Sequence, residues 1–460
     1  MGCSRSLPVP TGDRTPPRPS AGGPPRVPPD AGLPRTPPKV PRPTPAPLVD
    51  SPAVAALRAG LSATHPEATG SLLEEFWRTT AARTPLIESV GDERADPAHR
   101  SADERVVTFL WRDETADRVL VFVNRLTDER NLADSLMCRV PGTDVWHLSY
   151  RMDADWRASY AFLRQEVGEP APWVGPGDQA ALRAALDRGR PDPRNPEWSR
   201  NAAGVQQSVV ALPDASAQPW LRRRSWVRTG TVTPYAAPDG RPVWVYLPPG
   251  PVLDAALPLL VVFDGNTWLV HQDLPTTLDN LIADGDLPPV AAVLLDSGDR
   301  AERWARLDLD GGADRYVTEK LLPWACAEFP VTADPARTVV AGQSLGGLSA
   351  LLTGTASPDR VGAVIAQSAS LWHDGALDRL GGVPAAGLRV YLEVGRQEWV
   401  LREPNRRLGH ILAATGADVK FVEFNGGHDY ACWRGGIADG LRWISRDWWP
   451  GTASAPTVSA

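Results

Sequence analysis

Residues 337–354 read RTVVAGQSLGGLSALLTG, an apolar run that leads into the turn GQSLG and then directly into a stretch typical of a helix. A strand, a serine and a helix in this order are the setting of a nucleophile elbow. The glycines on either side of Ser344 remove Cβ atoms that would clash in so sharp a turn, and the serine lies at a helix N-terminus, where negative charge is stabilised. G-x-S-x-G alone is weak evidence in a chain with 40 glycines, but this context favours Ser344 as a catalytic nucleophile.

Apolar runs before and after this motif predict the rest of a sheet. Each run is rich in Val, Ile or Leu, and helical stretches such as YVTEKLLPWACAEF separate several of them. Strands that alternate with helices in this way are typical of a mainly parallel sheet covered on both faces, and with the elbow they predict an α/β-hydrolase domain. The runs lie at 241–250, 258–265, 290–296, 337–344, 361–368, 388–395 and 419–427. Catalytic residues are then expected at the carboxyl ends of these strands.

A serine hydroxyl needs a general base, and in this fold the acid and the base follow the serine in the order Ser, Asp or Glu, His. His428 follows the strand VKFVEF through the turn Asn-Gly-Gly, where the last strand would deliver a base. Of the other histidines after the serine, His373 could line the pocket, and His410 is expected on the surface of a helix. We therefore predict that His428 is the base.

The acid that orients the histidine is expected just beyond the strand LRVYLEVG, where Glu398 lies in GRQEW. Glu403 and Asp429 are the alternatives. Asp429 is adjacent to the histidine, and neighbouring side chains on a turn usually diverge, so we expect it to shape the loop. Glu393 lies inside the strand and is expected to make a structural contact. Glu398 is therefore the predicted acid.

Acyl transfer also requires two donors aimed at the oxyanion. The amide of Leu345, directly after the nucleophile, should be one of them. The second should come from the turn after the strand PLLVVFD, because the loop after an early strand supplies it in this fold. We assign this second donor to the backbone of Asn266.

Length and charge limit the class of the protein. With 460 residues the chain suits two or three domains and a large buried core. Its net charge of -7 and pI near 5.6 give no electrostatic footprint for nucleic acid, and no window approaches 18 consecutive apolar residues. We therefore expect neither a nucleic-acid binder nor a membrane-spanning protein.

The four cysteines are far apart and lack the spacing of metal ligands or of a disulfide framework. The N-terminal stretch MGCSRSLPVPTGDR lacks the apolar run of a secretory signal, and MGCSRS fits a myristoylation pattern only nominally. These features predict reduced thiols and a cytoplasmic protein. The cysteines are Cys3, Cys138, Cys326 and Cys432.

Changes in composition divide the chain into domains. Residues 1–50 contain 16 prolines and almost no large apolar side chains, so they cannot bury enough surface to fold. Helical periodicity at 53–61 and 71–79 gives way to alternating strands over 104–165, which are typical of an antiparallel β-sandwich. We predict a disordered Pro-rich tail at 1–50, a helical lead-in with the β-sandwich at 51–200, a linker at 201–225, the α/β-hydrolase domain at 226–450 and a disordered tail at 451–460.

Several segments resemble one known family. VVAGQSLGGLSALL, LLVVFDGNTW, LEVGRQEW and GGHDYACWRGG resemble the enterochelin (ferric enterobactin) esterases. Upstream, TFLWRD, PGTDVWHLSYRMDADWRASYAF and DPRNPEWS resemble the N-terminal β-domain of that family. The resemblance covers about residues 100–448 in the family's own order, and GGHDYACWRGG is far more specific than G-x-S-x-G.

The resemblance implies a cytoplasmic serine esterase that hydrolyses the ester bonds of a ferric triscatecholate trilactone siderophore after import and helps to release its iron. It implies no cofactor, because the iron arrives as part of the substrate, and it leaves the oligomeric state open. Carried over position by position, Ser344 is the nucleophile, Glu398 falls on the family's acidic position and His428 is the base. The β-domain is expected to hold remote parts of the siderophore, so its removal should spare the cleavage of a small aryl ester.

The resemblance also suggests residues that bind the substrate. Arg303, in DRAERWARL, falls on an arginine of a family loop that ends in Arg-x-x-Glu-Leu, and Arg306 stands at the Glu position, which departs from the family. A polyanionic ferric catecholate requires local positive charge, for which these two arginines and Arg434 are candidates. Trp433 and Trp372 are candidates for packing on catechol rings. Two alternatives stay open: an esterase or acyltransferase of this fold acting on another ester, and a non-catalytic siderophore-binding protein.

Overall fold

The computed structural model describes residues 46–90, 104–173, 179–250, 256–373 and 375–448, which belong to one compact unit. Most of the tail predicted at 1–50, and all of the tail predicted at 451–460, lie outside the described residues. Residues 46–50 are described, and they differ from the prediction. The N–H of Val49 donates to the carbonyl of Ser149 over 3.1 Å, and the N–H of Arg151 donates to the carbonyl of Pro47 over 3.0 Å. This short stretch is ordered because its backbone groups find partners on a strand.

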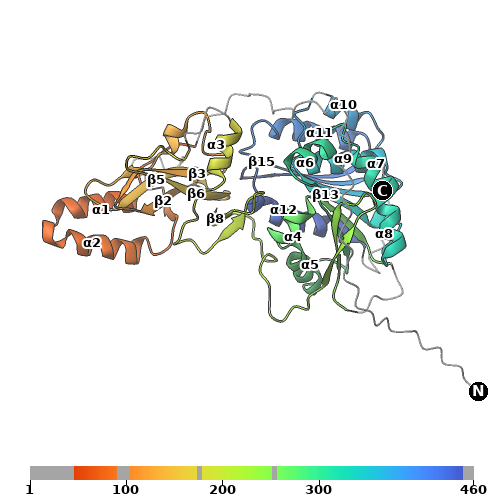
Figure 1. The fold of residues 1–460 in the computed structure, drawn as a ribbon, viewed down its shortest axis with the longest axis horizontal. Helices are drawn as coiled ribbons and strands as arrows, with labels where there is room; N and C mark the ends of the chain where they lie inside the picture. Colours follow the sequence, from red (N-terminus) through yellow and green to blue (C-terminus); the bar gives the residue numbers. More distant parts are fainter. Residues whose placement is uncertain (1–45, 91–103, 174–178, 251–255, 374, 449–460) are drawn as a thin grey trace, which may run out of the picture. The chain divides into compact units, whose positions relative to one another are not determined.

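The N-terminal domain is an antiparallel β-sandwich, as predicted (Figure 1). One sheet has the strand order β1-β2-β5-β4, and the other has the order β3-β6-β8-β7. Both sheets contribute to one core, which contains Phe109 and Leu148 from the first sheet and Val121 and Tyr160 from the second. The sheets therefore pack face to face. The strands are β1 (Leu86–Ser89), β2 (Glu104–Arg112), β3 (Ala116–Val123), β4 (Cys138–Arg139), β5 (Val145–Asp153), β6 (Arg157–Glu166), β7 (Trp198–Arg200) and β8 (Gln206–Ala211).

The edges of this domain depart from the predicted boundaries. Strand β8 lies inside the segment 201–225, which was predicted to be a linker, and it pairs with β6. The sandwich thus extends past residue 200, because β8 pairs with β6 on one side and with β7 on the other and so completes the second sheet. Helices α1 (Pro52–Ala63) and α2 (Thr69–Glu75) match the predicted helical lead-in, and Val54 and Trp77 bind this region to Leu110 of the sandwich.

The second domain is built on one eight-stranded sheet with the order β16-β15-β14-β13-β11-β12-β10-β9. The pairs from β16 to β12 are parallel, while β10 pairs antiparallel with β12 and with β9. This confirms the predicted mainly parallel sheet. Strand β9 was not predicted, because TVTPYA is a largely exposed edge strand without an apolar run. The strands are β9 (Thr231–Ala236), β10 (Pro242–Leu247), β11 (Leu259–Phe263), β12 (Ala291–Leu295), β13 (Thr338–Gln343), β14 (Ala363–Gln367), β15 (Arg389–Gly395) and β16 (Asp418–Phe424).

Helices cover both faces of this sheet, which is the arrangement of an α/β-hydrolase (Figure 1). Helices α8, α9 and α11 contribute to the core on one face, and α5 and α12 contribute to the core on the other. None of the helices within the described ranges is both long enough and apolar enough to cross a membrane. The helices from α3 onward are α3 (Gln179–Leu186), α4 (Gly265–Val270), α5 (Leu274–Ala283), α6 (Arg300–Leu307), α7 (Ala313–Tyr316), α8 (Leu322–Glu328), α9 (Leu345–Ala356), α10 (Ala376–Gly381), α11 (Arg402–Ala414) and α12 (Tyr430–Ile444).

Candidate active site

Ser344 occupies a sharp turn between β13 and α9. Its backbone has φ 58° and ψ -119°, a conformation that side chains with a Cβ atom rarely adopt and that costs about 1–3 kcal/mol. A Cβ atom at Gly342 would lie 2.5 Å from the carbonyl carbon of Gly346, so the close approach of these two backbones requires the glycine. The Ser344 N–H donates to the carbonyl of Gln367 over 2.9 Å. The geometry is that of the nucleophile elbow predicted from the sequence.

The three predicted catalytic residues, together with Ser368, which was not predicted, lie at the carboxyl ends of four neighbouring parallel strands. Ser344 follows β13, Ser368 follows β14, Glu398 comes three residues after β15, and His428 comes four residues after β16. These strands are consecutive in the sheet. The topology therefore brings residues that are far apart in the sequence to one edge of the sheet.

Glu398 and His428 form a direct pair. Oε2 of Glu398 lies 2.5 Å from Nδ1 of His428, and the glutamate side chain is fully buried. Its other oxygen, Oε1, accepts from Ser368 Oγ over 2.5 Å and from the N–H of Gly395 over 2.9 Å. This arrangement fixes the ring through Nδ1 and leaves Nε2 for chemistry.

The electrostatics of the pair suit a base. Burial alone would raise the pKa of Glu398, but His428 and the hydrogen bonds to the carboxylate outweigh burial and hold this pKa below its ordinary value. Burial lowers the pKa of His428, against the opposing effect of Glu398. The carboxylate is thus ionised and the imidazole neutral near pH 7, which is the state that can accept a proton.

Two serines in this region, Ser368 and Ser370, were not predicted to take part, and Trp433 was predicted only as a contact to the substrate. Ser370 Oγ lies 3.3 Å from Ser344 Oγ, and the N–H of Ser370 donates to the carbonyl of Ser344 over 3.0 Å. Ser368 Oγ accepts from the indole N–H of Trp433 over 3.0 Å while it donates to Glu398. The only signal in the sequence was the position of QSAS at the end of a strand beside the elbow.

The alternative acids make other contacts. Asp429 caps α12 by accepting from the N–H of Ala431 over 2.9 Å, and its other oxygen accepts from the N–H of Ser159 over 2.6 Å. Glu403 is exposed and pairs with Arg406 over 3.3 Å. Glu393 is buried within β15. The structure brings none of these carboxylates to Nδ1 of the histidine, which is bonded to Glu398.

The two other histidines also differ in position. His410 is exposed on α11, as expected. His373 is buried, stacks on Trp372 with ring centroids 3.8 Å apart, and has its Nδ1 3.2 Å from Asp308 Oδ1. Trp372 in turn lies 6.0 Å from Trp304 of α6, so three rings form one aromatic cluster.

The predicted oxyanion donors lie at the starts of two helices. Leu345 is the first residue of α9, and Asn266 is the second residue of α4. The first amides of a helix have no partner within it, and within the described ranges neither of these amides donates to another backbone carbonyl.

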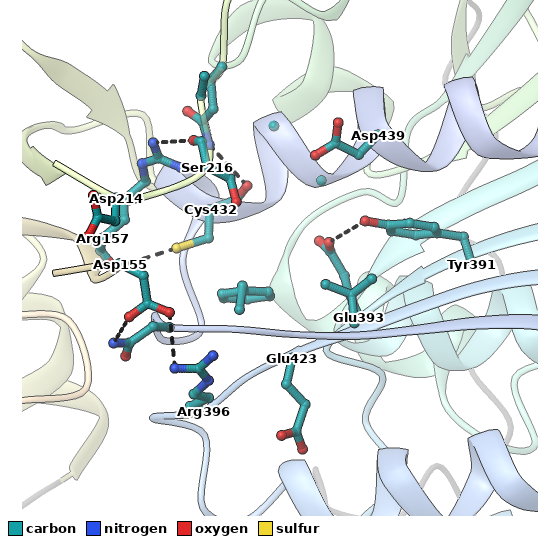
Figure 2. Close-up of a pocket in the computed structure, with 17 residues that line it drawn as sticks. Asp155, Arg157, Asp214, Ser216, Tyr391, Glu393, Arg396, Glu423, Cys432 and Asp439 are labelled. Atoms are coloured by element: carbon teal, nitrogen blue, oxygen red, sulfur yellow. Dashed lines mark hydrogen bonds and ion pairs between the residues drawn. The ribbon is translucent and has the colours of Figure 1, made fainter. Parts of the chain in front are cut away.

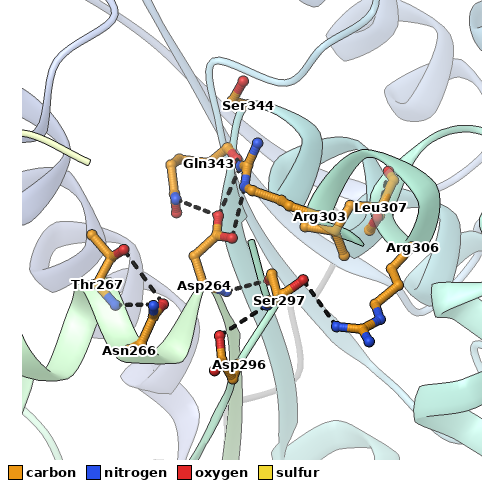
Figure 3. Close-up of polar contacts among 12 residues, drawn as sticks. Asp264, Asn266, Thr267, Asp296, Ser297, Arg303, Arg306, Leu307, Gln343 and Ser344 are labelled. Carbon is orange, nitrogen blue, oxygen red and sulfur yellow. Dashed lines mark hydrogen bonds and ion pairs between the residues drawn. The ribbon is translucent and has the colours of Figure 1, made fainter. Parts of the chain in front are cut away.

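Arg303 links the two sides of this region (Figure 3). Its Nε and Nη2 donate to the two carboxylate oxygens of Asp264 over 2.7 and 2.8 Å, and Nη2 also lies 3.4 Å from the carbonyl of Gln343. The amide of Gln343 donates to Asp264 over 2.7 Å. Burial alone would lower the pKa of Arg303, but the attraction to Asp264 outweighs burial and raises this pKa above its ordinary value. The guanidinium therefore stays charged. Asp264, which precedes α4, is thus joined to Arg303 by an ion pair and to Gln343, which precedes the nucleophile, by a hydrogen bond.

The remaining predicted binding residues have protein partners. Arg306 donates to the carbonyl of Ser297 over 3.2 Å and to Glu302 over 2.8 Å (Figure 3). Arg434 donates to the carbonyl of Trp198 over 2.8 Å, and burial together with Arg157 lowers its pKa to about 10. Trp433 is only 3% exposed, and its ring lies perpendicular to that of His428 with centroids 4.6 Å apart.

The described residues include no group of three or more His, Cys, Asp or Glu side chains arranged to hold a metal ion. Cys138, Cys326 and Cys432 are free thiols, and Cys3 lies outside the described residues.

Comparisons with known proteins agree with this architecture. The family model of the enterochelin esterase N-terminal domain matches residues 106–221, and that of the esterase family matches residues 236–444. The iron(III) enterobactin esterase of Dickeya dadantii is 32% identical over 81% of this chain and 93% of that protein. The iron(III) salmochelin esterase of an Escherichia coli O6:H1 strain is 31% identical over 85% of this chain and 97% of that protein.

A solved structure agrees as well. The enterobactin esterase of Shigella flexneri, crystallised in the presence of enterobactin, is 30% identical and superposes with a TM-score of 0.66 over 82% of this chain and 99% of that one. In this chain the N-terminal family model is followed by the esterase model, and the elbow lies within the second. The chain belongs to the enterochelin esterase family of carboxylic ester hydrolases.

Proposed function

We propose that the protein is a serine esterase that hydrolyses the ester bonds of a ferric triscatecholate trilactone siderophore in the cytoplasm and so helps to release its iron. The observation that carries this proposal is the convergence of the Ser344 elbow with the Glu398–His428 pair at the ends of neighbouring strands. The relatives named as iron(III) enterobactin and salmochelin esterases support the choice of substrate.

The mechanism follows from the roles of the side chains. His428 Nε2 takes the proton of Ser344 Oγ as the oxygen attacks the ester carbonyl, and Glu398 stabilises the imidazolium that forms. The backbone N–H groups of Leu345 and Asn266 donate hydrogen bonds to the carbonyl oxygen and stabilise the negative charge that develops on it. The imidazolium then gives its proton to the leaving alkoxide. Water, activated by the same histidine, hydrolyses the acyl-enzyme and restores the serine.

The substrate is polyanionic while the chain has a net charge of -7, so positive charge must be gathered at the site. Arg303, Arg306 and Arg434 are the proposed contacts, although the charge of Arg303 is already shared with Asp264. Trp372 is partly exposed beside Trp304, which supports the proposed packing on a catechol ring. Trp433 is buried, and its bond to Ser368 favours a role in positioning Glu398.

The test is chromatography of the products after incubation of the pure protein with the ferric and the iron-free trilactone, beside Ser344→Ala. Serine-dependent release of linear catecholate fragments is expected. Hydrolysis of a simple aryl ester without hydrolysis of either trilactone would show that the substrate of this esterase is a different ester. Tight binding of the siderophore without any turnover would identify a binding protein.

A further inference from the structure

The turn after β3, in the N-terminal sandwich, contacts the loop that carries His428. Asn124 is buried, and its Nδ2 donates to the carbonyl of His428 over 3.0 Å. A Cβ atom at Gly427 would lie 2.5 Å from Asn124 Oδ1 and 2.5 Å from Arg125 Cγ. Arg125 adopts the left-handed backbone conformation, with a φ of 62°, so the chain turns here at a residue that is not glycine. The two segments therefore pack with no space between them.

Strand β6 and Asp155, two residues before it, hold the same loop at its two ends. The N–H of Arg157 donates to the carbonyl of Asn425 over 2.9 Å, and the N–H of Ser159 donates to Asp429 over 2.6 Å. The amide of Asn425 also donates to Asp155 over 2.6 Å. Figure 2 shows Asp155 and Arg157 of this junction, which line a cavity of about 270 Å³. The histidine loop is thus bonded to Glu398 on one side and to the sandwich on the other.

Arg125 adds positive charge to this junction. Its guanidinium carbon lies 5.6 Å from the ring centroid of Trp399, the residue after Glu398. The charge of Arg125 lowers the pKa of Glu398 and also that of His428. The other charged groups that act on His428 are Glu398, which opposes this effect, and Arg183 of α3, which adds to it. The arginine therefore favours an ionised carboxylate and a neutral imidazole, the state that general-base catalysis needs.

We propose that the Asn124–Arg125 turn completes the catalytic site, with Asn124 fixing the main chain at His428 and Arg125 supplying positive charge beside the catalytic pair. The inference rests on the proposed function for the identity of the base. Asn124 and Arg125 are positioning residues that act through His428, so their effect should be the same for every ester that the enzyme cleaves. The N-terminal domain is then required for the cleavage of small esters as well, which replaces the expectation that its removal would spare them.

The charge is tested without any substrate. The imidazole of His428 is titrated by NMR in the full-length protein, with its signal assigned by its loss in His428→Ala. Arg125→Gln should raise the pKa of His428, because a cation that disfavours the imidazolium has been removed. Arg118→Gln, which removes an exposed arginine from β3, should leave the titration unchanged. Equal titrations in wild type and Arg125→Gln would overturn the role of Arg125, whatever ester the protein cleaves.

The positioning role of Asn124 is tested on a small aryl ester. Asn124→Ala removes the bond to His428, and Gly427→Ala places a methyl group between the turn and the loop. Both should lower kcat roughly three- to tenfold with little change in KM, as expected for the loss of one positioned hydrogen bond. Gly70→Ala, where a Cβ atom meets nothing within 4 Å, is the matched control. Wild-type kcat in both variants would refute the role of Asn124. If Asn124→Ala does not fold, Gly427→Ala decides.

A separate result would reject the proposed function. If Ser344→Ala keeps the activity on the aryl ester, the elbow is not the catalytic site, whereas the titration of His428 still measures the effect of Arg125. The two proposals therefore fail on different measurements.

Discussion

Glu393 of β15 lies so close to Gly436 of α12 that a Cβ atom at the glycine would collide with its carboxylate. Burial raises the pKa of Glu393 to about 8, and the amide of Gln367 donates to it over 2.6 Å. The unfolded chain has an ordinary carboxyl with a pKa of 4.5. Between these two values the folded protein binds a proton that the unfolded chain has released, so folding is favoured at the acidic end of this interval and loses stability as the pH rises.

Glu393→Gln should remove this pH dependence, because the amide has no proton to lose. The free energy of unfolding in urea is measured near pH 5 and near pH 8 for both proteins, a range that covers most of the interval between the two pKa values. The variant should gain stability relative to wild type as the pH increases. Glu67→Gln, at an exposed position, serves as the control. A constant difference between wild type and Glu393→Gln would show that the carboxyl titrates normally.

Ser344→Ala should abolish ester hydrolysis while the siderophore still binds within a few-fold of wild type. Loss of an activated nucleophile costs roughly three orders of magnitude or more in rate. Hydrolysis is followed by chromatography, and binding is followed by quenching of tryptophan fluorescence. A variant that keeps more than about a tenth of the wild-type rate would disprove the assignment of the nucleophile.

His428→Ala should be about as damaging as loss of the serine, because the two act as one unit, whereas Glu398→Gln should cost less. Asp429→Asn should cost less than His428→Ala, since asparagine still caps the helix and loses only the acceptor for the N–H of Ser159. The measurement is kcat/KM on the trilactone and on an aryl ester. If the Asp429 variant is crippled and the Glu398 variant is not, the acid has been assigned wrongly.

Arg303→Lys should separate two roles of the arginine. Lysine keeps the charge but cannot bond both oxygens of Asp264, so the contact between the elbow and the oxyanion turn loosens. If the ion pair positions the oxyanion donors, kcat falls on small and large esters alike. An increase in KM for the trilactone alone, with kcat on the aryl ester unchanged, would instead identify Arg303 as a contact to the siderophore.

Truncation at the N-terminus should distinguish two nearby start points. A chain that begins at residue 51 lacks the backbone bonds between residues 47–49 and β5, whereas a chain that begins at residue 46 retains them. Losing these two bonds should lower the free energy of unfolding by about 1–2 kcal/mol. Thermal unfolding of the two truncated proteins measures the difference. Equal stability would mean that this short pairing contributes nothing.

The parts of the structure that were predictable from the sequence are those with a local signal. The elbow at Ser344 joins a strand, a turn and a helix that are adjacent in the chain, so periodicity and glycine spacing reveal it. The order of strands then restricts the acid and the base to the ends of β15 and β16. Glu398 and His428, at these two ends, form a hydrogen-bonded pair.

The contacts that escaped prediction join segments that are distant in the sequence. Ser368 belongs to no recognisable sequence motif, and its role is evident only from its hydrogen bonds to Glu398 and Trp433. The contact of Asn124 with the histidine loop depends on how two domains pack, which no periodic pattern reveals. The same is true of β8, which belongs to the sandwich because of its partner strand β6 rather than its position in the chain.

The bond between Asn124 and His428 joins residues that are 304 positions apart. Domains generally fold as units, the N-terminal one first, and on that order the sandwich would be complete before the histidine loop leaves the ribosome. That loop then docks onto a preformed surface, and this is among the last contacts to be made. Turnover of a small ester would therefore be a sensitive reporter of complete folding, lost under mild denaturing conditions before the helices and strands of either domain melt.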